Sequence, residues 1–267
     1  MKKIITAAAM SLIMGDPALA EDRRGEVMPS VAPSVLSEAD IQSVSPALAR
    51  FGSEIMKDDL WKRKELSMRD RSIVTLAILI ARNQPAELNH YVNIALNNNV
   101  TPAEVSEIIT HLAFYSGWPN AMSAIAVTKK VFQERGIKPE QLAAASPELL
   151  PLNQAAEKLR SEAVEKNVGA ISPGLVKFTT APLFLDLWQR PALKPRDRSL
   201  VTVSALIAEG QIAQIGYHLN RAMDNGLTAE EAGEIVTHSS FYAGWPNAFS
   251  AVPVVGEVLR ARTSKEE

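Results

Sequence analysis

The sequence contains no cysteine, which excludes disulfide bonds, a thiol nucleophile, a thiol redox couple and a thiolate metal site. It also lacks a surplus of either charge, because 28 Lys and Arg oppose 30 Asp and Glu for a formal net charge of −2. Without a basic surplus or a basic tail, we expect no nucleic acid and no membrane among the partners. A hydrophobic fraction of 46% and a charged fraction of 22% are those of a globular protein. The expected partner, a small-molecule substrate, follows from the motifs described below.

The N-terminus differs from the rest of the chain. Two lysines precede a mainly apolar run, Ile4–Met14, and small residues lead up to Ala20. This order is typical of a secretory signal peptide, and the apolar run is too short to span a bilayer. We therefore expect a signal peptide at residues 1–20, cleaved after Ala20, and a periplasmic or secreted protein. Residues 21–37, rich in Pro, Ser and charge, are expected to form a flexible leader.

An aromatic octapeptide occurs twice in the chain, as FYSGWPNA at residues 114–121 and as FYAGWPNA at residues 241–248. The same spacing of 127 residues joins two RDRS motifs, at residues 69–72 and 196–199. A constant offset without gaps indicates a tandem duplication. The two copies are either two fused domains or two halves of one pseudo-symmetric unit.

The local signals in each copy are helical, so we predict an all-α fold. Residues 72–81 and 199–208 could be buried strands by their β-branched content alone, but their length and context favour buried helices. Asn99 and Gly226 hold equivalent positions, where a left-handed residue would close a helix. The Gly-Trp-Pro triplets of the octapeptides then separate two helices in each copy.

These signals define the expected domain limits. We expect a first repeat domain at residues 38–135, a turn-rich connector at residues 136–151 and a second repeat domain at residues 152–262. The second domain opens with one amphipathic helix at residues 152–167.

The polar residues that could carry chemistry recur in both copies. His111 and His238 are equivalent, and each precedes a tyrosine, Tyr115 or Tyr242, by four residues. Each histidine therefore shares a helix face with its tyrosine. The structural alternative is a histidine that packs in the core of the protein.

A second polar group has histidine and tyrosine in swapped order. At equivalent positions the first copy has Glu87, His90 and Tyr91, and the second copy has Gln214, Tyr217 and His218. A carboxylate beside an imidazole orients the ring and raises its pKa, as general acid–base chemistry requires. Only the first copy keeps the carboxylate. If the copies pack against each other, we expect Glu87 to serve an imidazole across their interface.

The chain resembles the carboxymuconolactone decarboxylase family in a run of motifs: R-D-R-S-[IL]-V-T, E-L-x-x-[HY], N-N-x-[VL]-T-x-x-E and H-x-x-F-Y-x-G-W-P-N-A. The resemblance covers both copies, and the Gly-Trp-Pro corner is its most specific part. It implies an all-α fold of two tandem helical repeats that form a pseudo-dimer. It also implies that whole chains assemble into a homo-oligomer, for which a trimer is the first expectation.

Two branches of this family matter here. One performs peroxide chemistry with a Cys-x-x-Cys-x-x-x-His segment, and the absence of cysteine excludes that route. The other is cysteine-free and acts on γ-carboxymuconolactone. The chain departs from the second branch at Tyr91, where the family has histidine, and at Gln214, where it has glutamate. The signal peptide is a third departure, because the catabolic enzyme of the family works in the cytoplasm.

The resemblance implies a non-redox enzyme without a cofactor, a carboxy-lyase that decarboxylates or isomerises a small carboxylated lactone. The candidate catalytic residues are Glu87, His90, His111, His218 and His238. The candidate substrate-binding residues are Arg71, Arg198, Tyr91, Tyr115, Trp118, Gln214, Tyr217, Tyr242 and Trp245. The two arginines could hold a substrate carboxylate. Helix capping and solvated charge are the alternative interpretation of their RDRS motifs.

Two other functions stay open. The incomplete Glu–His sets are also those of a non-catalytic periplasmic small-molecule-binding or scaffold protein on the same fold. Glu87 and His90 have the three-residue spacing of helical di-metal sites, although the second copy has no such pair. The leading interpretation contains no metal.

Overall fold

The computed structural model describes residues 36–266, with side chains up to residue 264. The predicted signal peptide and nearly all of the predicted leader lie outside these residues. The first repeat contains α1 (Glu38–Val44), α2 (Pro46–Phe51), η2 (Gly52–Lys57), η3 (Leu60–Lys62), α3 (Met68–Ala81), α4 (Pro85–Asn97), α5 (Pro102–Tyr115) and α6 (Trp118–Glu134). The segment between the repeats contains η4 (Pro139–Gln141) and α7 (Gln154–Val168). The second repeat contains α8 (Pro173–Phe178), η5 (Thr179–Phe184), η6 (Leu187–Gln189), α9 (Pro195–Glu209), α10 (Ile212–Asp224), α11 (Ala229–Ala243) and α12 (Trp245–Glu266).

Every element of the described range is a helix, so the predicted all-α class is confirmed. The offset of 127 residues is kept: α2 and α8, η2 and η5, η3 and η6, and α4 and α10 begin and end at equivalent positions. The two segments rich in β-branched residues are buried helices, α3 and α9, as their length predicted. The helix α7 is the amphipathic helix predicted at residues 152–167. It does not correspond to α1 at this offset, because the bounds of the two helices differ.

The helix ends follow the local sequence signals. Asn99 and Gly226 have φ of 65° and 98°, the left-handed conformation predicted for them. Gly117 and Gly244 have φ of 91° and 92° with ψ of 149°, a conformation that a side chain would strain. These glycines turn the chain from α5 into α6 and from α11 into α12, and the aromatic octapeptides lie at the two corners.

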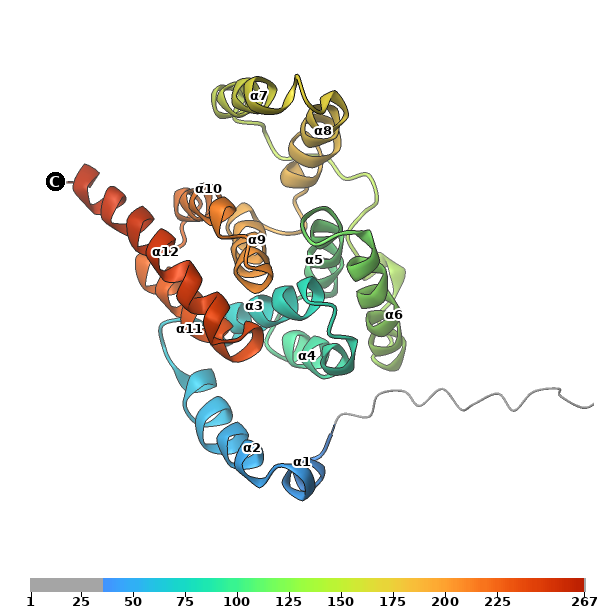
Figure 1. Cartoon of the computed structure of the whole chain (residues 1–267). Coiled ribbons are helices and arrows are strands. Elements are labelled where there is room, and N and C mark those ends of the chain that lie inside the picture. Colours follow the sequence, from blue (N-terminus) through green and yellow to red (C-terminus); the bar gives the residue numbers. More distant parts are fainter. Residues whose placement is uncertain (1–35, 267) are drawn as a thin grey trace, which may run out of the picture. The chain divides into compact units, whose positions relative to one another are not determined.

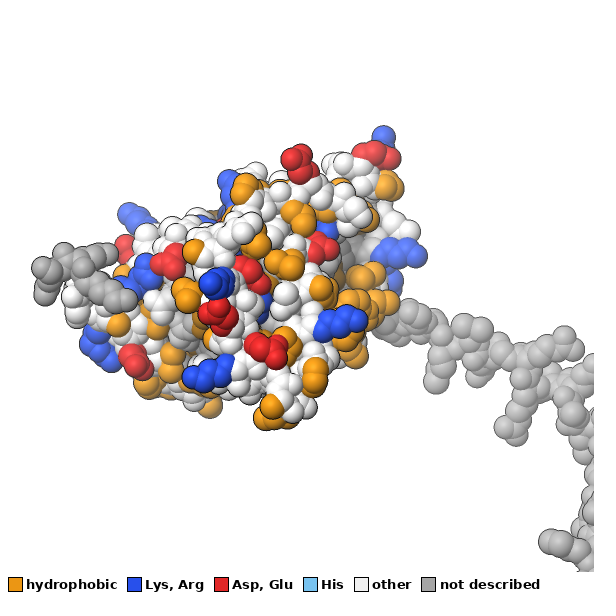
Figure 2. All heavy atoms as spheres, turned by 90° about the horizontal axis from the view of Figure 1, so that it is seen from above, with side chains coloured by type: hydrophobic (Ala, Val, Ile, Leu, Met, Phe, Trp, Pro, Cys, Tyr) orange, Lys and Arg blue, Asp and Glu red, His pale blue; other side chains and the backbone are white. Residues whose placement is uncertain are grey.

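The two repeats share one core. The central helices α3 and α9 pack against each other, α5 also packs on α9, and α11 also packs on α3 (Figure 1). Buried hydrophobic side chains of both repeats belong to one cluster, and the described residues 36–266 lie in one compact unit. The duplication has therefore produced two halves of one pseudo-symmetric unit. On the face that Figure 2 shows, acidic, basic and hydrophobic side chains are intermixed.

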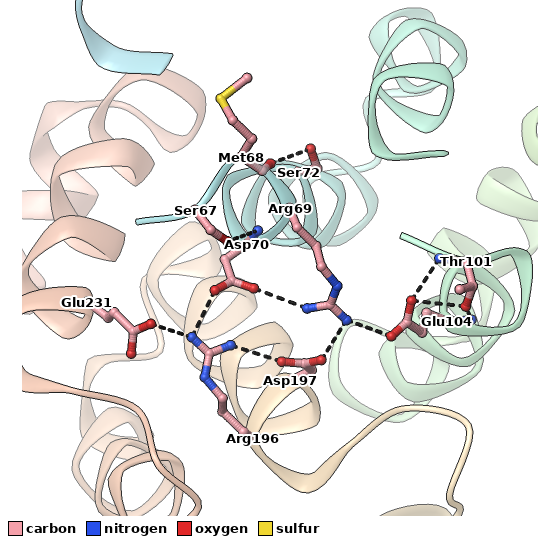
Figure 3. A network of polar contacts seen from close by, with 10 residues as sticks. All are labelled: Ser67, Met68, Arg69, Asp70, Ser72, Thr101, Glu104, Arg196, Asp197 and Glu231. Atoms are coloured by element: carbon pink, nitrogen blue, oxygen red, sulfur yellow. Dashed lines mark hydrogen bonds and ion pairs between the residues drawn. The ribbon is translucent and has the colours of Figure 1, made fainter. Parts of the chain in front are cut away.

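The RDRS motifs join the two repeats through a symmetric set of ion pairs (Figure 3). Arg69 donates to Asp197 at 2.7 Å, and Arg196 donates to Asp70 at 2.8 Å. Arg69 also donates to Glu104, and Arg196 to Glu231, each at 2.6 Å. These glutamates form capping boxes with Thr101 and Thr228 at the starts of α5 and α11. The two aspartates are only 6% and 3% exposed, so water screens these pairs weakly. The motifs therefore hold α3 and α9 in register.

The buried aspartate gives a stability prediction. Asp197→Asn removes a charge that faces both Arg69 and Arg196, at 2.7 and 2.9 Å. We expect the free energy of unfolding to fall by about 1.5–3 kcal/mol, the usual weight of hydrogen bonds to charged groups. Urea unfolding followed by circular dichroism measures this. The control is Glu54→Gln, which breaks an exposed pair with Arg50 and should cost under about 1 kcal/mol. Equal effects of the two changes would contradict a joining role for Asp197.

Candidate active site

The structure contains two equivalent polar clusters, and each takes side chains from both repeats. The first half-site consists of Trp61, Arg71, Thr75 and Tyr91 from the first repeat and of Glu234, His238 and Tyr242 from α11. The second half-site consists of Trp188, Arg198, Thr202 and His218 from the second repeat and of Glu107, His111 and Tyr115 from α5. The contact of α11 with α3 and of α5 with α9 brings these groups together.

In the first half-site, protein groups occupy both ring nitrogens of His238. Arg71 Nη1 lies 3.3 Å from Nδ1, and because a guanidinium can only donate, Nδ1 accepts. The proton is therefore on Nε2, which donates to Thr75 Oγ1 at 2.8 Å, while the Thr75 hydroxyl donates to the carbonyl oxygen of Arg71. Burial and the charge of Arg71 lower the pKa of His238 to about 3. The ring is thus neutral and held in one tautomer.

His111 has the same arrangement in the second half-site. Arg198 Nη1 lies 3.4 Å from Nδ1, and Nε2 lies 2.7 Å from Thr202 Oγ1. Complete burial, followed by the charge of Arg198, lowers the pKa of His111 well below its ordinary value. Neither repeated histidine keeps a nitrogen for a substrate, so the geometry favours the structural interpretation of this pair.

The two candidate arginines, Arg71 and Arg198, are fully buried. Arg71 Nη2 donates to Glu234 at 2.8 Å, and Arg198 Nη2 donates to Glu107 at 2.7 Å. These carboxylates come from the opposite repeat in each case, and each also pairs with a second arginine, Arg63 for Glu234 and Arg190 for Glu107. The two candidate arginines are therefore engaged by protein carboxylates. The sequence analysis missed both glutamates. Their signal was present, because each lies four residues before a repeated histidine on the same helix face.

The expected contact between Glu87 and a histidine across the interface is not formed. Glu87 and the equivalent Gln214 are exposed, and no side-chain hydrogen bond joins either of them to a histidine within residues 36–264. Glu87 lies in the first turn of α4, ahead of the buried positions Leu88, Val92 and Ala95. The four-residue spacing aligns Glu87 with Tyr91 along the helix but leaves it outside the core.

Aromatic hydroxyls close the first half-site. Trp61 Nε1 donates to Tyr242 at 2.9 Å, and Tyr242 in turn donates to Tyr91 at 3.0 Å. Tyr91 lies where the second half-site has His218. His90 is partly exposed, with its ring edge-on to Tyr91 at 5.1 Å between centroids. This half-site therefore pairs its hydroxyl groups with one another.

His218 gives the second half-site a different content. Its ring stacks on Trp188 at 5.8 Å and meets Tyr115 edge-on at 5.3 Å, between ring centroids. The side chain is 6% exposed, and its buried Nδ1 has no hydrogen-bond partner in the described part of the chain. Burial and the charge of Arg221 lower the pKa of His218 to about 4. The ring is therefore neutral near pH 7 and has a free nitrogen.

A cavity of about 190 Å³ is lined by Trp188 and Tyr217, two residues whose rings contact His218, although His218 is not itself part of the wall. Its walls include Trp188, Tyr217 and Arg221 from the second repeat, and the remaining wall comes largely from residues 150–160, between the repeats. The Arg221 guanidinium lies over the Trp188 ring at 4.2 Å, and its buried Nε has no hydrogen-bond partner among the residues described. The sequence analysis missed Arg221, although it lies three residues after His218 and so shares its helix face.

The corner tryptophans lie away from both half-sites. Trp118 and Trp245 are 60% and 51% exposed, and each packs edge-on against the phenylalanine of its own octapeptide. The tyrosines of the octapeptides, Tyr115 and Tyr242, do point into the half-sites. The octapeptide thus supplies one buried polar ring to a half-site and one exposed aromatic ring to the surface.

No cluster of three or more His, Asp or Glu side chains in residues 36–264 is arranged to hold a metal ion. None of the helices in the described range has the length and apolar character that crossing a membrane requires.

Comparison with known proteins gives one family. The family model of the "Carboxymuconolactone decarboxylase family" matches residues 46–130 and again residues 173–257. The 4-carboxymuconolactone decarboxylase of Acinetobacter baylyi is 35% identical over 92 residues, which are 34% of this chain and 69% of the relative. The nitrosuccinic acid decarboxylase npaB of Metarhizium robertsii is 33% identical over 81 residues, which are 30% of this chain and 57% of the relative. Both relatives are decarboxylases by name.

The lowered histidine pKa values give a prediction for acid stability. A histidine in the unfolded chain has the ordinary pKa of 6.5, whereas the pKa of His238 in the folded protein is lowered to about 3. Between these two pKa values the unfolded state binds more protons than the folded state. The contribution of His238 to the free energy of unfolding is therefore fully present above about pH 6.5 and is lost as the pH is lowered. Urea midpoints measured from about pH 7 down to about pH 5 should therefore decrease.

The matched variants are His238→Gln, which removes the titrating ring and can still form hydrogen bonds, and His90→Gln, at a partly exposed position. The loss of stability between these two pH values should be smaller in His238→Gln than in wild type and unchanged in His90→Gln. The same dependence on pH in all three proteins would show that His238 does not contribute.

Proposed function

We propose, from the premise that the chain belongs to the carboxymuconolactone decarboxylase family, that it is a decarboxylase whose working site is the second half-site. The observation that carries this proposal is His218. Of the buried histidines within residues 36–264, it alone has a ring nitrogen free of protein partners.

The chemistry of decarboxylation defines what such an imidazole can do. When a carboxylate leaves as CO₂, the C–C bond breaks and its electron pair moves into a neighbouring electron-withdrawing group. The reaction is accelerated by hydrogen-bond donors placed where that charge develops. In the proposed step His218 donates an N–H to the charged oxygen, and a proton from solvent then adds to the carbon. The products are CO₂ and the substrate with hydrogen in place of the carboxylate.

The protonation state of His218 supports this role. With a pKa lowered to about 4, the ring is neutral near pH 7. A neutral imidazole can donate a hydrogen bond to an enolate oxygen, and a lowered pKa keeps it in that form. This role replaces the expected imidazolium paired with a carboxylate, because no carboxylate within residues 36–264 forms an ion pair with His218 and the pKa of His218 is lowered.

In the proposal the substrate reaches His218 from the cavity past Tyr217. Trp188 and Tyr217, which both contact the imidazole, separate it from the cavity. Trp188 is 1% exposed, whereas Tyr217 is 49% exposed. In the proposal the Tyr217 ring turns outward when the substrate enters.

The proposed substrate is a small carboxylated lactone, or an acid whose departing carboxylate is attached beside a comparable electron-withdrawing group. The names of the two relatives, which specify 4-carboxymuconolactone and nitrosuccinic acid, support this choice. Export is also part of the proposal. It is based on residues 1–20, which lie outside the described range.

The change His218→Asn tests the proposed function. We expect turnover of 4-carboxymuconolactone, followed as CO₂ release, to fall by roughly 10²–10³-fold, the usual cost of removing one such donor. Circular dichroism should stay unchanged. Arg135→Met is the control and should keep full turnover, because Arg135 makes its hydrogen bonds to Asn93 and Asn97 in the first repeat. Undiminished turnover in His218→Asn would remove this residue from the reaction.

The pH profile separates the neutral imidazole from the imidazolium. In the proposed mechanism kcat/KM is constant near neutral pH and falls in acid, with an apparent pKa of about 4. If kcat/KM instead rose as the pH was lowered through the same range, the active form would be the imidazolium. Substrate binding without any CO₂ release would favour the alternative, a small-molecule-binding protein on the same fold.

We also propose that whole chains associate into a homo-oligomer, a trimer being the first expectation. Large hydrophobic side chains are exposed at equivalent positions of the two repeats: Trp118, Met122 and Ile125 on α6, and Trp245, Phe249 and Val252 on α12. Light scattering at micromolar concentration should report several copies. Met122→Glu together with Phe249→Glu should shift the particle toward a single chain. A wild-type protein that is strictly monomeric would overturn the proposal.

A further inference from the structure

We infer that Arg160 and Arg221 form an anion-binding subsite in the cavity of the second half-site, and that each chain has one such subsite. This inference is based on the proposed function only in placing the anion beside His218. The expected ligand group is a carboxylate of a small organic acid, held at a distance from the reacting carbon.

The wall of the cavity is the first observation. About half of its lining residues lie at positions 150–160, between the repeats. The two family matches end at residue 130 and resume at residue 173, so this wall lies outside both of them. The Leu150 N–H donates to the carbonyl oxygen of Gln189 at 2.7 Å, and Arg190 donates to the carbonyl oxygens of Ala144 and Ala145. These bonds hold the segment against the second repeat.

Arg160 on α7 supplies the first unused donor. Its side chain is 7% exposed, and Nε and Nη2 donate to the two carboxylate oxygens of Glu157 at 2.7 and 2.6 Å. The third nitrogen, Nη1, is buried and has no partner within the described residues. A buried N–H without an acceptor is costly, and an acid in the cavity would supply the acceptor.

Arg221 on α10 supplies the second. No carboxylate pairs with it in the described part of the chain, and its buried Nε lacks an acceptor. Both guanidinium groups lie over the ring of Phe184, with Cζ at 4.2 Å from the ring centroid for Arg160 and 5.8 Å for Arg221, so the two Cζ atoms are no more than about 10 Å apart. Glu157 is the one acidic residue in the cavity wall, against these two arginines. The cavity therefore has one uncompensated positive charge.

The size and position of the cavity agree with a small acid. A volume of 190 Å³ corresponds to several water molecules, since each occupies about 30 Å³ of the liquid. His218 and Arg221 are three residues apart on α10 and share a face, so an anion on Arg221 lies next to the imidazole. A carboxylate accepts the paired N–H donors of a guanidinium well.

The first half-site cannot form the same subsite. The residue equivalent to Arg221 is Ile94, which offers no donor. The structure describes no second copy of α7 within residues 36–266, and α7 itself packs on α8 of the second repeat. The inference is therefore one anion for each chain.

Titration calorimetry of the whole chain tests the inference. The probes are acetate, succinate and benzoate, with succinamide as the uncharged match for succinate. We expect at least one carboxylate to bind with a stoichiometry of one per chain, and succinamide to bind far more weakly. Arg221→Met and Arg160→Met should each weaken the carboxylate by roughly tenfold or more, because a charge-assisted pair is lost. Arg135→Met, in the first repeat, should leave binding unchanged.

The inference would be overturned if none of the three carboxylates bound, or if wild type and Arg221→Met bound them with equal affinity. Arg221 is less buried than Arg160, so its variant keeps the test decisive if Arg160→Met fails to fold. A stoichiometry of two would contradict the single subsite. His218→Asn should retain carboxylate binding. Retained binding with undiminished turnover in that variant would disprove the proposed function and leave the anion subsite standing.

Discussion

The buried pairing of an arginine in one repeat with a glutamate in the other is the interaction on which the rest of the structure depends. Arg71 with Glu234 and Arg198 with Glu107 lie in the shared core, where an unpaired charge would be strongly destabilising. Each arginine also presents a second nitrogen to a histidine and thereby selects its tautomer. The packing of α11 on α3 and of α5 on α9 is therefore specified by charge as well as by apolar contact.

On this symmetric frame the two half-sites have diverged in content. Both keep the arginine, the glutamate, the inner histidine and the tryptophan-to-tyrosine hydrogen bond. They differ at the next position outward, where Tyr91 occupies the first and His218 the second. A hydroxyl can donate to its neighbour and accept from it, so Trp61, Tyr242 and Tyr91 form a chain of hydrogen bonds in the first half-site. The imidazole of the second has no such neighbour and is left available.

Much of the fold was predictable because its signals are local. The offset of 127 residues, the capping boxes at Thr101 and Thr228, and the left-handed Asn99 and Gly226 can all be recognised within a few residues of sequence. The half-sites could be predicted only in part. Helical spacing shows which residues share a face, but it does not show whether that face is buried, and so Glu87 was expected inside the site.

The missed residues share one physical feature: their role depends on contacts between distant parts of the chain. Glu107 and Glu234 matter because of arginines in the opposite repeat, and Arg160 because α7 packs against the second repeat. The sequence pattern predicted a raised histidine pKa, and this prediction was wrong for the same reason. Burial dominates those shifts, and the depth of a side chain is a property of the assembled core.

The segment between the repeats exists once, and this has a consequence for how such a protein can evolve. When a gene encodes one subunit of a symmetric pair, every substitution appears in both copies of a site at once. Joining two copies in one reading frame removes that coupling and also creates a stretch of chain without a twin. The linker can cover only one of the two sites, so gene fusion alone breaks their equivalence. The uncovered copy is then free to change, provided that it still supplies its share of the common core.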